Sequence, residues 1–262
     1  MSYNGRIMLM DKHNLIKLSR DRSARWGSGL FWVDGVNFVD QAIKKGWEIN
    51  TLVYLADKLD TPFKHEVIHA IPKDNRMLIG HAVYEKLAYK GDIQGIGAVV
   101  KMKSEKDKLL PGSGIVLENT QYAGNLGTIM RTALGFGIKN IYLVGKTVDP
   151  FAPEVVRSSM GAIFGINIIL IDDLSILSNS SNIALSLDED ASDFRKHKHE
   201  GNFMLWLGHE GRGLTPQAKS MCQTKLKIQI SADIDSLNIA EACAIALYEF
   251  TANSHLSGGQ PL

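Results

Sequence analysis

The sequence has 262 residues, of which 45% are hydrophobic and 22% are charged. These fractions are close to globular averages, so they exclude a largely disordered chain, and the length suits two domains of ordinary size. No stretch of about 18 uncharged apolar residues occurs, so we expect no transmembrane helix. Two cysteines are too few for a disulfide framework. We therefore expect a soluble, cytoplasmic protein with reduced thiols.

The net charge of +1 is divided unevenly along the chain. Residues 1–110 contain 18 Lys and Arg against 13 Asp and Glu, whereas residues 111–262 contain 11 against 15. A basic front half favours contact with a polyanion such as RNA. Many domains without a nucleic-acid role carry a similar excess, so charge alone leaves both interpretations open.

The first hundred residues mix short strands and helices. The pattern predicts strands at residues 29–35, 50–55 and 96–100, and helices at residues 36–45 and 76–87. These elements indicate a small α/β domain at residues 1–101. The polar segment 102–113, which ends in proline and glycine, predicts an interdomain linker.

Residues 114–262 alternate between apolar runs and helical patterns. Predicted strands cover residues 114–118, 140–144, 167–171, 183–186, 203–207 and 226–230. Predicted helices cover residues 125–134, 153–161, 216–222 and 237–252. Such alternation indicates an α/β domain with a parallel sheet and helices on both of its faces.

A glycine-containing loop follows the first strand of this second domain. Gly124 and Gly127 allow a tight turn where the next helix begins. Arg131 follows Asn125 by about one and two-thirds helical turns, which places a cation near the helix entry. A glycine-lined turn with a surface arginine is the alternative interpretation.

Two further polar loops follow later strands, at the edge where open α/β sheets bind ligands. In the sequence LGHEGRGL, three glycines surround Glu210 and predict a backbone-lined pocket with one carboxylate; a flexible surface turn is the alternative. In the third loop, Ser236 and Asn238 enter the last helix, where a serine is ordinarily an N-cap.

The ordered set NLGTIMRTA, LGHEGRGL and SLNIAEACAIALYE resembles the three signature motifs of the SpoU branch (TrmH family) of the SPOUT methyltransferases, from about residue 114 to residue 252. The segments LIKLSRDRSAR and GLFWVDG are similar to the ribosomal-protein-like substrate-binding domain that often precedes this catalytic domain. The resemblance implies a SPOUT-type parallel sheet with a C-terminal deep trefoil knot, a homodimer, and S-adenosyl-L-methionine as cofactor. The implied reaction is 2′-O-methylation of a ribose in structured RNA, with ribosomal RNA as the expected substrate.

The resemblance also implies roles for individual residues. The catalytic cluster would comprise Asn125, Arg131, Glu210, Ser236 and Asn238. The cofactor would contact Leu207, Gly208, Gly211, Ile228, Ile230 and Leu237. RNA would contact Arg20, Arg22, Arg25 and Arg131. Since arginine is not an ordinary base at neutral pH, we expect Arg131 to stabilise the developing alkoxide.

We expect no metal site, because His197 and His199 lie in a charged stretch without a nearby cysteine and indicate a solvated turn. Relatives commonly carry Asp-Pro where Tyr122 and Ala123 stand, and a proline where Gln229 stands. His209 replaces a small or amide residue, and a loop histidine with satisfied hydrogen bonds is the simplest interpretation.

Three alternative functions stay open. The chain is expected to modify transfer RNA if the ribosomal RNA assignment is wrong. A non-catalytic RNA-binding protein that retains the fold is the second alternative. An unrelated oxidoreductase with a parallel sheet is the third, and it ranks last because the dinucleotide-binding glycine fingerprint is missing.

Overall fold

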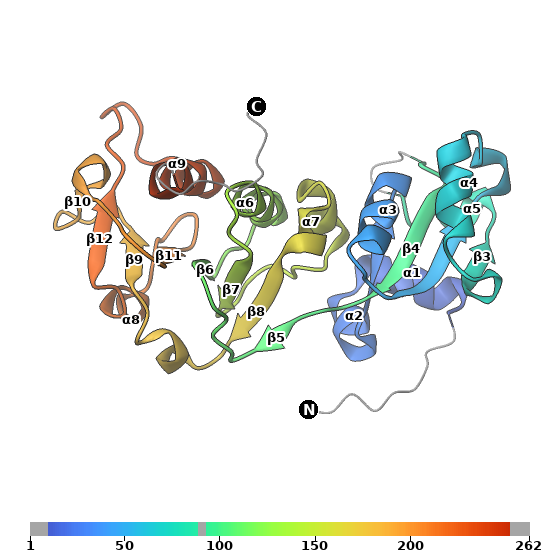
Figure 1. Cartoon of the computed structure of the whole chain (residues 1–262), viewed down its shortest axis with the longest axis horizontal. Coiled ribbons are helices and arrows are strands. Elements are labelled where there is room, and N and C mark those ends of the chain that lie inside the picture. Colours follow the sequence, from blue (N-terminus) through green and yellow to red (C-terminus); the bar gives the residue numbers. More distant parts are fainter. Residues whose placement is uncertain (1–9, 89–92, 252–262) are drawn as a thin grey trace. The chain divides into compact units, whose positions relative to one another are not determined.

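The computed structural model describes residues 10–88 and 93–251 (Figure 1). The chain divides into two compact units. The first consists of residues 1–102 together with residues 151–157, and the second consists of residues 103–150 together with residues 158–262. The first unit therefore includes a short segment from the second half of the sequence. The predicted domains, residues 1–101 and 114–262, assigned that segment to the second domain.

The first unit contains a four-stranded sheet with the order β1-β4-β2-β3. Its strands are β1 (Leu30–Asp34), β2 (Ile49–Tyr54), β3 (Arg76–Leu78) and β4 (Ile96–Lys101). Its helices are α1 (Lys12–Arg20), α2 (Arg22–Ser28), α3 (Val36–Lys44), α4 (Pro62–His69) and α5 (His81–Tyr84). β4 lies antiparallel to both β1 and β2, and β3 lies parallel to β2.

The predicted helix at residues 76–87 is wrong. The chain instead forms β3, whose residues pair with β2, and then the short helix α5. The apolar spacing of this stretch does fit a helix, but the open edge of β2 offers backbone partners to residues 76–78. Tyr84 of α5 is buried in the core, and its hydroxyl donates to Asp34 at 2.8 Å.

Two aspartates begin the first two helices of this unit. Asp11 accepts a hydrogen bond from the backbone N–H of Asn14 at 2.7 Å, and Asp21 accepts one from Ser23 at 2.7 Å. Both are N-caps, which satisfy backbone donors that the first helical turn leaves open. Asp21 lies at the corner between α1 and α2, and Leu15 of α1 is fully buried.

The segment 151–157 belongs to the first unit through aromatic contacts. The ring of Phe151 is fully buried and lies 4.9 Å from the ring of Phe31 and 5.9 Å from that of Trp26. Helix α7 (Pro153–Ser158) follows directly.

The second unit is built on an eight-stranded sheet in which every pair of neighbours is parallel. The spatial order is β10-β12-β9-β11-β6-β7-β8-β5. The strands are β5 (Glu105–Lys106), β6 (Gly114–Glu118), β7 (Asn140–Val144), β8 (Asn167–Ile171), β9 (Asn182–Leu185), β10 (Ser192–Asp193), β11 (Met204–Leu207) and β12 (Thr224–Lys227). The helices are α6 (Ala123–Gly135), α8 (Pro216–Ser220) and α9 (Ile239–Thr251). The predicted parallel sheet is confirmed.

Two predicted boundaries change in this unit. Residues 105–106 of the predicted linker form β5, which pairs with β8, so the polar linker is shorter than expected. The predicted strand at 226–230 begins and ends earlier, as β12, and Ile228 and Ile230 lie beyond it. β12 pairs with β9 as far as Leu226 and with the two-residue strand β10 as far as Lys227, where β12 ends.

Both faces of the large sheet are buried. Val116, Tyr142 and Trp206 pack together on one face with Ala218 of α8. Their strand neighbours Ile115 and Ile141 point to the other face and are also fully buried. Helices α6 and α9 lie next to one another on the side of the sheet away from α8 (Figure 1). Helices on both faces explain why the strands are apolar throughout.

Strand order determines where the polar loops meet. β6 lies between β7 and β11, and all three strands run in the same direction. Their carboxyl ends, at Glu118, Val144 and Leu207, therefore lie at one edge of the sheet. No helix within the described ranges has both the length and the hydropathy needed to cross a membrane.

Candidate active site

A cavity of about 440 Å³ opens at this edge of the second unit. Its walls include all six residues predicted to contact the cofactor, namely Leu207, Gly208, Gly211, Ile228, Ile230 and Leu237. Two predicted catalytic residues, Glu210 and Ser236, also line it. The volume falls within the range of about 300–1,000 Å³ that is common for small-molecule pockets.

The loop that follows β11 is compact because two glycines approach each other. A Cβ on Gly208 would overlap the backbone of Gly213 and Leu214, so only glycine fits there. Gly213 has a φ of 66°, which favours glycine, and its N–H donates to the carbonyl of His209 at 2.8 Å. Gly208, Gly211 and Gly213 all line the cavity, so no side chain covers the backbone at these three positions.

His209 stabilises the same loop from inside. Its backbone N–H donates to Gly213 at 3.0 Å, and its Nδ1 accepts from the N–H of Gly211 at 2.9 Å. Since Nδ1 is an acceptor, the ring carries any single proton on Nε2. These bonds favour the interpretation of His209 as a loop histidine with satisfied hydrogen bonds.

The three predicted motifs meet in a chain of side-chain hydrogen bonds. The Nδ2 of Asn238 donates to Oδ1 of Asn125 at 3.0 Å, and the Nδ2 of Asn125 donates to Oε1 of Glu210 at 3.1 Å. The backbone N–H groups of Gln121 and Tyr122 each donate to the Glu210 carboxylate at 3.3 Å. One carboxylate therefore joins the loop after β6 to the loop after β11.

These hydrogen bonds determine the charge of Glu210. Burial acts to raise its pKa, but hydrogen bonds from its own backbone, from Asn125 and from the N–H groups of Gln121 and Tyr122 outweigh burial and lower the pKa below its ordinary value. At neutral pH Glu210 is a carboxylate that accepts hydrogen bonds, so it is not a proton donor.

Asn238, rather than Ser236, caps the last helix. α9 begins at Ile239, and the Oδ1 of Asn238 accepts from the N–H of Ala240 at 2.8 Å. Ser236 is exposed two residues earlier and lines the cavity. The capping role that the sequence suggested for Ser236 is therefore wrong, since the first helical turn is satisfied by its neighbour.

Arg131 stands apart from this network. It lies on α6 with an exposed side chain. Within residues 10–88 and 93–251 its guanidinium takes part in none of the side-chain hydrogen bonds or ion pairs that join Asn125, Glu210 and Asn238. Arg131 thus presents a cation to solvent on the helix that begins at the network.

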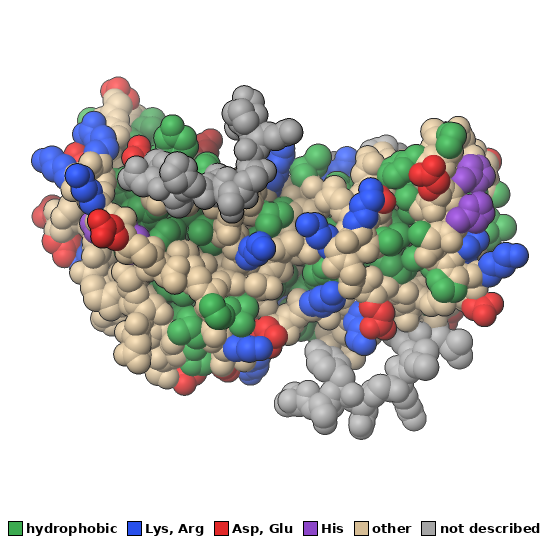
Figure 2. All heavy atoms as spheres, in the orientation of Figure 1, with side chains coloured by type: hydrophobic (Ala, Val, Ile, Leu, Met, Phe, Trp, Pro, Cys, Tyr) green, Lys and Arg blue, Asp and Glu red, His purple; other side chains and the backbone are tan. Residues whose placement is uncertain are grey.

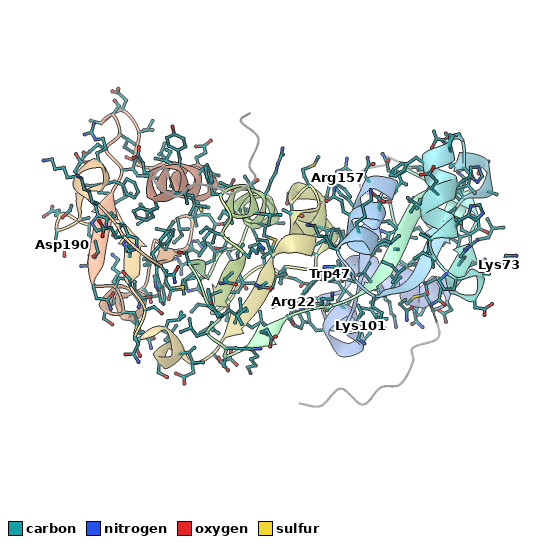
Figure 3. The ribbon with its side chains drawn as sticks, viewed as in Figure 1. Arg22, Trp47, Lys73, Lys101, Arg157 and Asp190 are labelled. Carbon is teal, nitrogen blue, oxygen red and sulfur yellow. The ribbon has the colours of Figure 1, made fainter. Side chains whose placement is uncertain are left out.

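Two polar pairs near the cavity were not predicted. The buried carboxylate of Glu118 accepts from Thr215, through the backbone N–H at 2.8 Å and the hydroxyl at 2.7 Å. In the cavity wall, Lys219 donates to Asp188 at 2.6 Å, and this bond lowers the pKa of Asp188. Next to this pair, Lys225 donates to Asp190, which Figure 3 labels on the loop after β9. Each pair joins loops distant in sequence, which explains why no local pattern revealed it.

Replacing Glu118 by alanine is expected to destabilise the fold by about 1–3 kcal/mol, because the partly buried donors of Thr215 would lose their acceptor. Urea unfolding, compared with wild type, measures the loss. Glu200→Ala, which removes an exposed carboxylate of the same unit, is the matched control. Equal unfolding midpoints for the two variants would contradict the role of Glu118.

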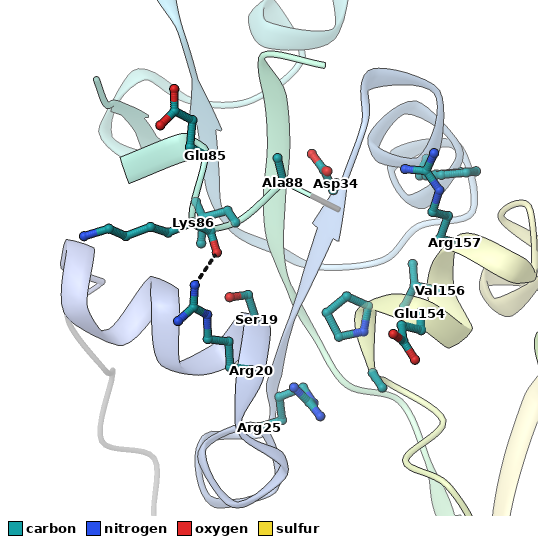
Figure 4. Close-up of a pocket in the computed structure, with 14 residues that line it drawn as sticks. Ser19, Arg20, Arg25, Asp34, Glu85, Lys86, Ala88, Glu154, Val156 and Arg157 are labelled. Carbon is teal, nitrogen blue, oxygen red and sulfur yellow. Dashed lines mark hydrogen bonds between the residues drawn. The ribbon is translucent and has the colours of Figure 1, made fainter. Parts of the chain in front are cut away.

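A second pocket, of about 500 Å³, lies in the first unit (Figure 4). Its charged lining comprises the basic residues Arg20, Arg25, Lys86 and Arg157 and the acidic residues Asp34, Glu85 and Glu154. The Nη2 of Arg20 donates to the carbonyl of Lys86 at 3.4 Å, drawn as the dashed line in Figure 4. Arg20 and Lys86 are both exposed.

Of the four arginines predicted to contact RNA, the three in the first unit differ in exposure. Arg20 and Arg22 are exposed, and Figure 3 labels Arg22 at the start of α2. Arg25 is only 3% exposed, and its Nη1 donates to the carbonyl of Leu18 at 2.8 Å. Arg25 therefore supports the corner between α1 and α2 and does not present its guanidinium on an open surface.

His197 and His199 do not form the solvated turn that the sequence suggested. Their rings stack at 6.1 Å and contact the ring of Phe250 on α9 at 6.2 and 5.7 Å. Burial, together with the neighbouring His199, lowers the pKa of His197. In the part of the chain that the structure describes, no group of three or more His, Cys, Asp or Glu side chains is placed to hold a metal ion.

Comparison with known proteins places this geometry in a family. Residues 113–248, more than half of the chain, match the model of the SpoU rRNA Methylase family, and residues 14–98 match an MRM3-like substrate binding domain. The 23S rRNA (uridine(2479)-2′-O)-methyltransferase of Streptomyces viridochromogenes is 24% identical over 247 residues, covering 87% of this chain and 85% of that protein.

Solved structures agree over nearly the whole chain. The AdoMet-bound rRNA methyltransferase from Sinorhizobium meliloti is 25% identical with a TM-score of 0.82, covering 93% of this chain and 94% of that one. The SpoU methyltransferase AviRb from Streptomyces viridochromogenes, in complex with AdoMet, is 22% identical with a TM-score of 0.84, covering 95% and 98%. The chain belongs to the SpoU rRNA Methylase family.

Proposed function

We propose that this protein transfers a methyl group from S-adenosylmethionine to a ribose 2′-hydroxyl of ribosomal RNA. One observation carries the proposal: the hydrogen-bonded chain Asn238–Asn125–Glu210 borders a cavity whose walls contain every predicted cofactor residue. The relative from Streptomyces viridochromogenes is a 23S rRNA 2′-O-methyltransferase, which supports the choice of RNA and of acceptor atom.

The cavity fits the cofactor chemically. Leu207, Ile228 and Leu237 offer apolar walls, and the tight glycine loop offers backbone donors and acceptors. Charged groups of both signs, including Asp188 and Lys219, border the same space and suit a ligand with a sulfonium, an ammonium and a carboxylate. When bound, S-adenosylmethionine supplies a methyl group on a positively charged sulfur with a neutral leaving group.

The residues of the chain then have separate tasks. Glu210 holds Asn125 and the N–H groups of the loop after β6, so that the acceptor side of the cavity keeps one geometry. A 2′-hydroxyl must lose its proton as the new C–O bond forms. We propose that the guanidinium of Arg131 stabilises the negative charge that develops on that oxygen, and that an RNA phosphate oxygen accepts the proton.

The first unit, which the sequence suggested to be ribosomal-protein-like, is proposed to bind the RNA. The match of residues 14–98 to a substrate binding domain supports this role. Figure 2 shows Lys and Arg side chains interspersed with Asp and Glu on one face of this unit. We assign the phosphate contacts to the exposed Arg20, Arg22 and Lys86, with Arg25 supporting them from below.

Removing these cations is expected to weaken the salt dependence of RNA binding. The double substitution Arg20→Ala with Lys86→Ala removes two phosphate contacts, so the slope of log K against log salt should fall by about 0.7–1 per contact. Fluorescence anisotropy with labelled 23S ribosomal RNA fragments measures it. Lys73→Ala removes an exposed lysine elsewhere on the unit and should leave the slope unchanged (Figure 3). An unchanged slope in the double variant would refute the assignment.

We further propose a deep trefoil knot in the C-terminal part and a homodimer, as the family resemblance implies. The position of β11 between β6 and β9 is compatible with a threaded chain. For the dimer, α9 offers an apolar surface: Ile245 is 40% and Tyr248 is 64% exposed, and the ring of Tyr248 contacts Phe136 at 6.4 Å. The protein is proposed to act in the cytoplasm, which suits its two free thiols.

Tyr248→Asp is expected to raise the dissociation constant of the dimer by about tenfold or more, because it would bury an unpaired carboxylate on both sides of a two-fold interface. Sedimentation velocity measures the oligomeric state. Leu109→Asp places the same charge at another exposed apolar position, 44% exposed, and should leave the dimer intact. If Tyr248→Asp sediments like wild type, α9 does not form the interface.

The function itself is tested by methyl transfer from radiolabelled S-adenosylmethionine. The acceptors are unmodified 23S ribosomal RNA, 16S ribosomal RNA and transfer RNA, followed by mass-spectrometric mapping of 2′-O-methyl nucleotides. Methylation of one ribosomal RNA ribose is the expected result. Methylation of transfer RNA alone would overturn the substrate, and cofactor binding without transfer to any RNA would overturn the reaction.

A further inference from the structure

The loop that follows β6 carries an exposed aromatic side chain. Tyr122 directly precedes α6, and its side chain is 64% exposed. The apolar faces of a large exposed aromatic ring stay in contact with water unless a ligand packs against them. Its position is therefore informative about what approaches the site.

The backbone at Tyr122 is held firmly. Its N–H donates to Glu210 at 3.3 Å, and its carbonyl accepts from Leu126 in the first turn of α6 at 3.2 Å. Asn125, three residues later, belongs to the chain of hydrogen bonds that links the three motifs. The Tyr122 ring thus extends from a backbone that the catalytic carboxylate itself fixes.

A lysine is held beside the same loop. The backbone N–H of Lys146 donates to Oδ1 of Asn119 at 2.9 Å, and the side chain of Gln121 donates to the carbonyl of Lys146. Asn119 has a φ of 56° and Gly145 has a φ of 72°, so both loops turn sharply where they meet. The Lys146 side chain is exposed. The ends of β6 and β7 therefore present an aromatic ring and a cation on adjacent loops.

We infer that Tyr122 and Lys146 form the subsite for the acceptor nucleotide, with the tyrosine ring stacked on its base and the lysine ammonium on an adjoining phosphate. RNA-modifying sites bind unstacked nucleotides, and aromatic side chains replace the stacking that such a base loses. The inference rests on the proposed function, because it needs a single-stranded RNA acceptor at this edge of the sheet.

The subsite predicts a specific change in steady-state kinetics. Tyr122→Ala should raise the KM for 23S ribosomal RNA by about 5- to 100-fold, since stacking on an aromatic residue contributes that much per base. The KM for S-adenosylmethionine should stay unchanged, because Tyr122 does not line the cofactor cavity. Tyr122→Phe keeps the ring and should behave as wild type.

Lys146 has a matched control just before the strand that it follows. Lys146→Gln and Lys139→Gln remove the same charge from exposed positions at opposite ends of β7. The first should weaken RNA binding and lower its salt slope by about 0.7–1, as expected for one lost phosphate contact. The second should change neither quantity.

Binding of fluorescein-labelled decauridylate, measured by anisotropy, provides a readout that needs no turnover. Weaker binding by Tyr122→Ala, with Tyr122→Phe at the wild-type level, supports the subsite. The inference is overturned if Tyr122→Ala binds like wild type, if Tyr122→Phe is impaired equally, or if Tyr122→Ala dissociates the dimer in sedimentation. If the wild-type protein transferred no methyl group to RNA, the proposed function would be refuted. Decauridylate binding would still test whether Tyr122 binds a nucleotide. Tyr122→Leu replaces Tyr122→Ala if the thermal midpoint of the latter falls.

Discussion

Replacing Arg131 by alanine is expected to lower kcat by about 10²- to 10³-fold while leaving the Kd for S-adenosylmethionine within about twofold of wild type. The side chain is exposed on α6 and lies outside the cofactor cavity, so cofactor binding does not depend on it. Turnover is expected to depend on it, because Arg131 is the one Lys or Arg on α6, the helix that carries Asn125.

Single-turnover methyl transfer and calorimetry with S-adenosylmethionine separate the two quantities. Arg131→Lys keeps the charge but loses the planar pair of donors, so it should recover only part of the rate. Arg195→Ala removes an exposed arginine of the same unit that pairs with Asp193, and it should turn over normally. Wild-type turnover in Arg131→Ala would remove Arg131 from the mechanism.

The sequence predicted the large sheet well because its strands are buried on both faces. Apolar runs such as residues 114–118 and 140–144 indicate buried parallel strands when helical patterns separate them. The same logic located the cofactor cavity. Parallel strands bring their carboxyl ends to one edge of the sheet, so the glycine-rich loop after β11 and the polar loop after β12 were expected at the same edge. All six predicted cofactor residues line one cavity for that reason.

Where pairing partners come from distant parts of the chain, sequence patterns failed. Residues 76–78 have helical spacing but add to the edge of β2, and only the tertiary structure supplies that edge. Arg25 was expected to be a surface cation, although the corner between α1 and α2 buries it against Leu18. Glu118 and Thr215 are 97 positions apart, so no local window reveals their pair.

The candidate site likewise contains features that the sequence predicted and one that only the structure shows. Asn125, Glu210 and Asn238 came from motif resemblance, and the structure joins them by hydrogen bonds. Ser236 was in the motif as well, but the helix starts later than the pattern suggested, so its neighbour Asn238 provides the cap. The motif therefore identified the residues of the site. Which of them caps the helix depends on where the helix begins, and the motif did not show that.

Glu210→Gln is expected to lower kcat by about 100-fold, because an amide offers one acceptor oxygen where the carboxylate offers two. Oε1 accepts from Asn125 and Tyr122, and Oε2 accepts from Gln121. In the variant, one of these donors would face an NH₂ group. The loop after β6 would then lose its fixed position, and Asn125 would lose its orientation.

The pH dependence of stability tests the same network independently of turnover. Hydrogen bonds hold the pKa of folded Glu210 below the ordinary glutamate value of 4.5, although burial alone would raise it. The stabilisation is therefore complete above the pKa of the unfolded chain and is lost as the pH falls through the lower folded value. Wild type should exceed Glu210→Gln in stability at pH 7, and the difference should shrink as the pH falls below about 4.5.

Urea unfolding of both proteins between pH 7 and pH 3 measures this difference. Asn125→Ala is the informative companion, since it removes a donor to Glu210 without removing the carboxylate. Its pH dependence should be shallower than that of wild type but steeper than that of Glu210→Gln, because the N–H groups of Gln121 and Tyr122 still favour the ionised form. A stability difference that stays constant with pH would show that Glu210 contributes through packing, and the lowered pKa would then play no part in holding the three motifs together.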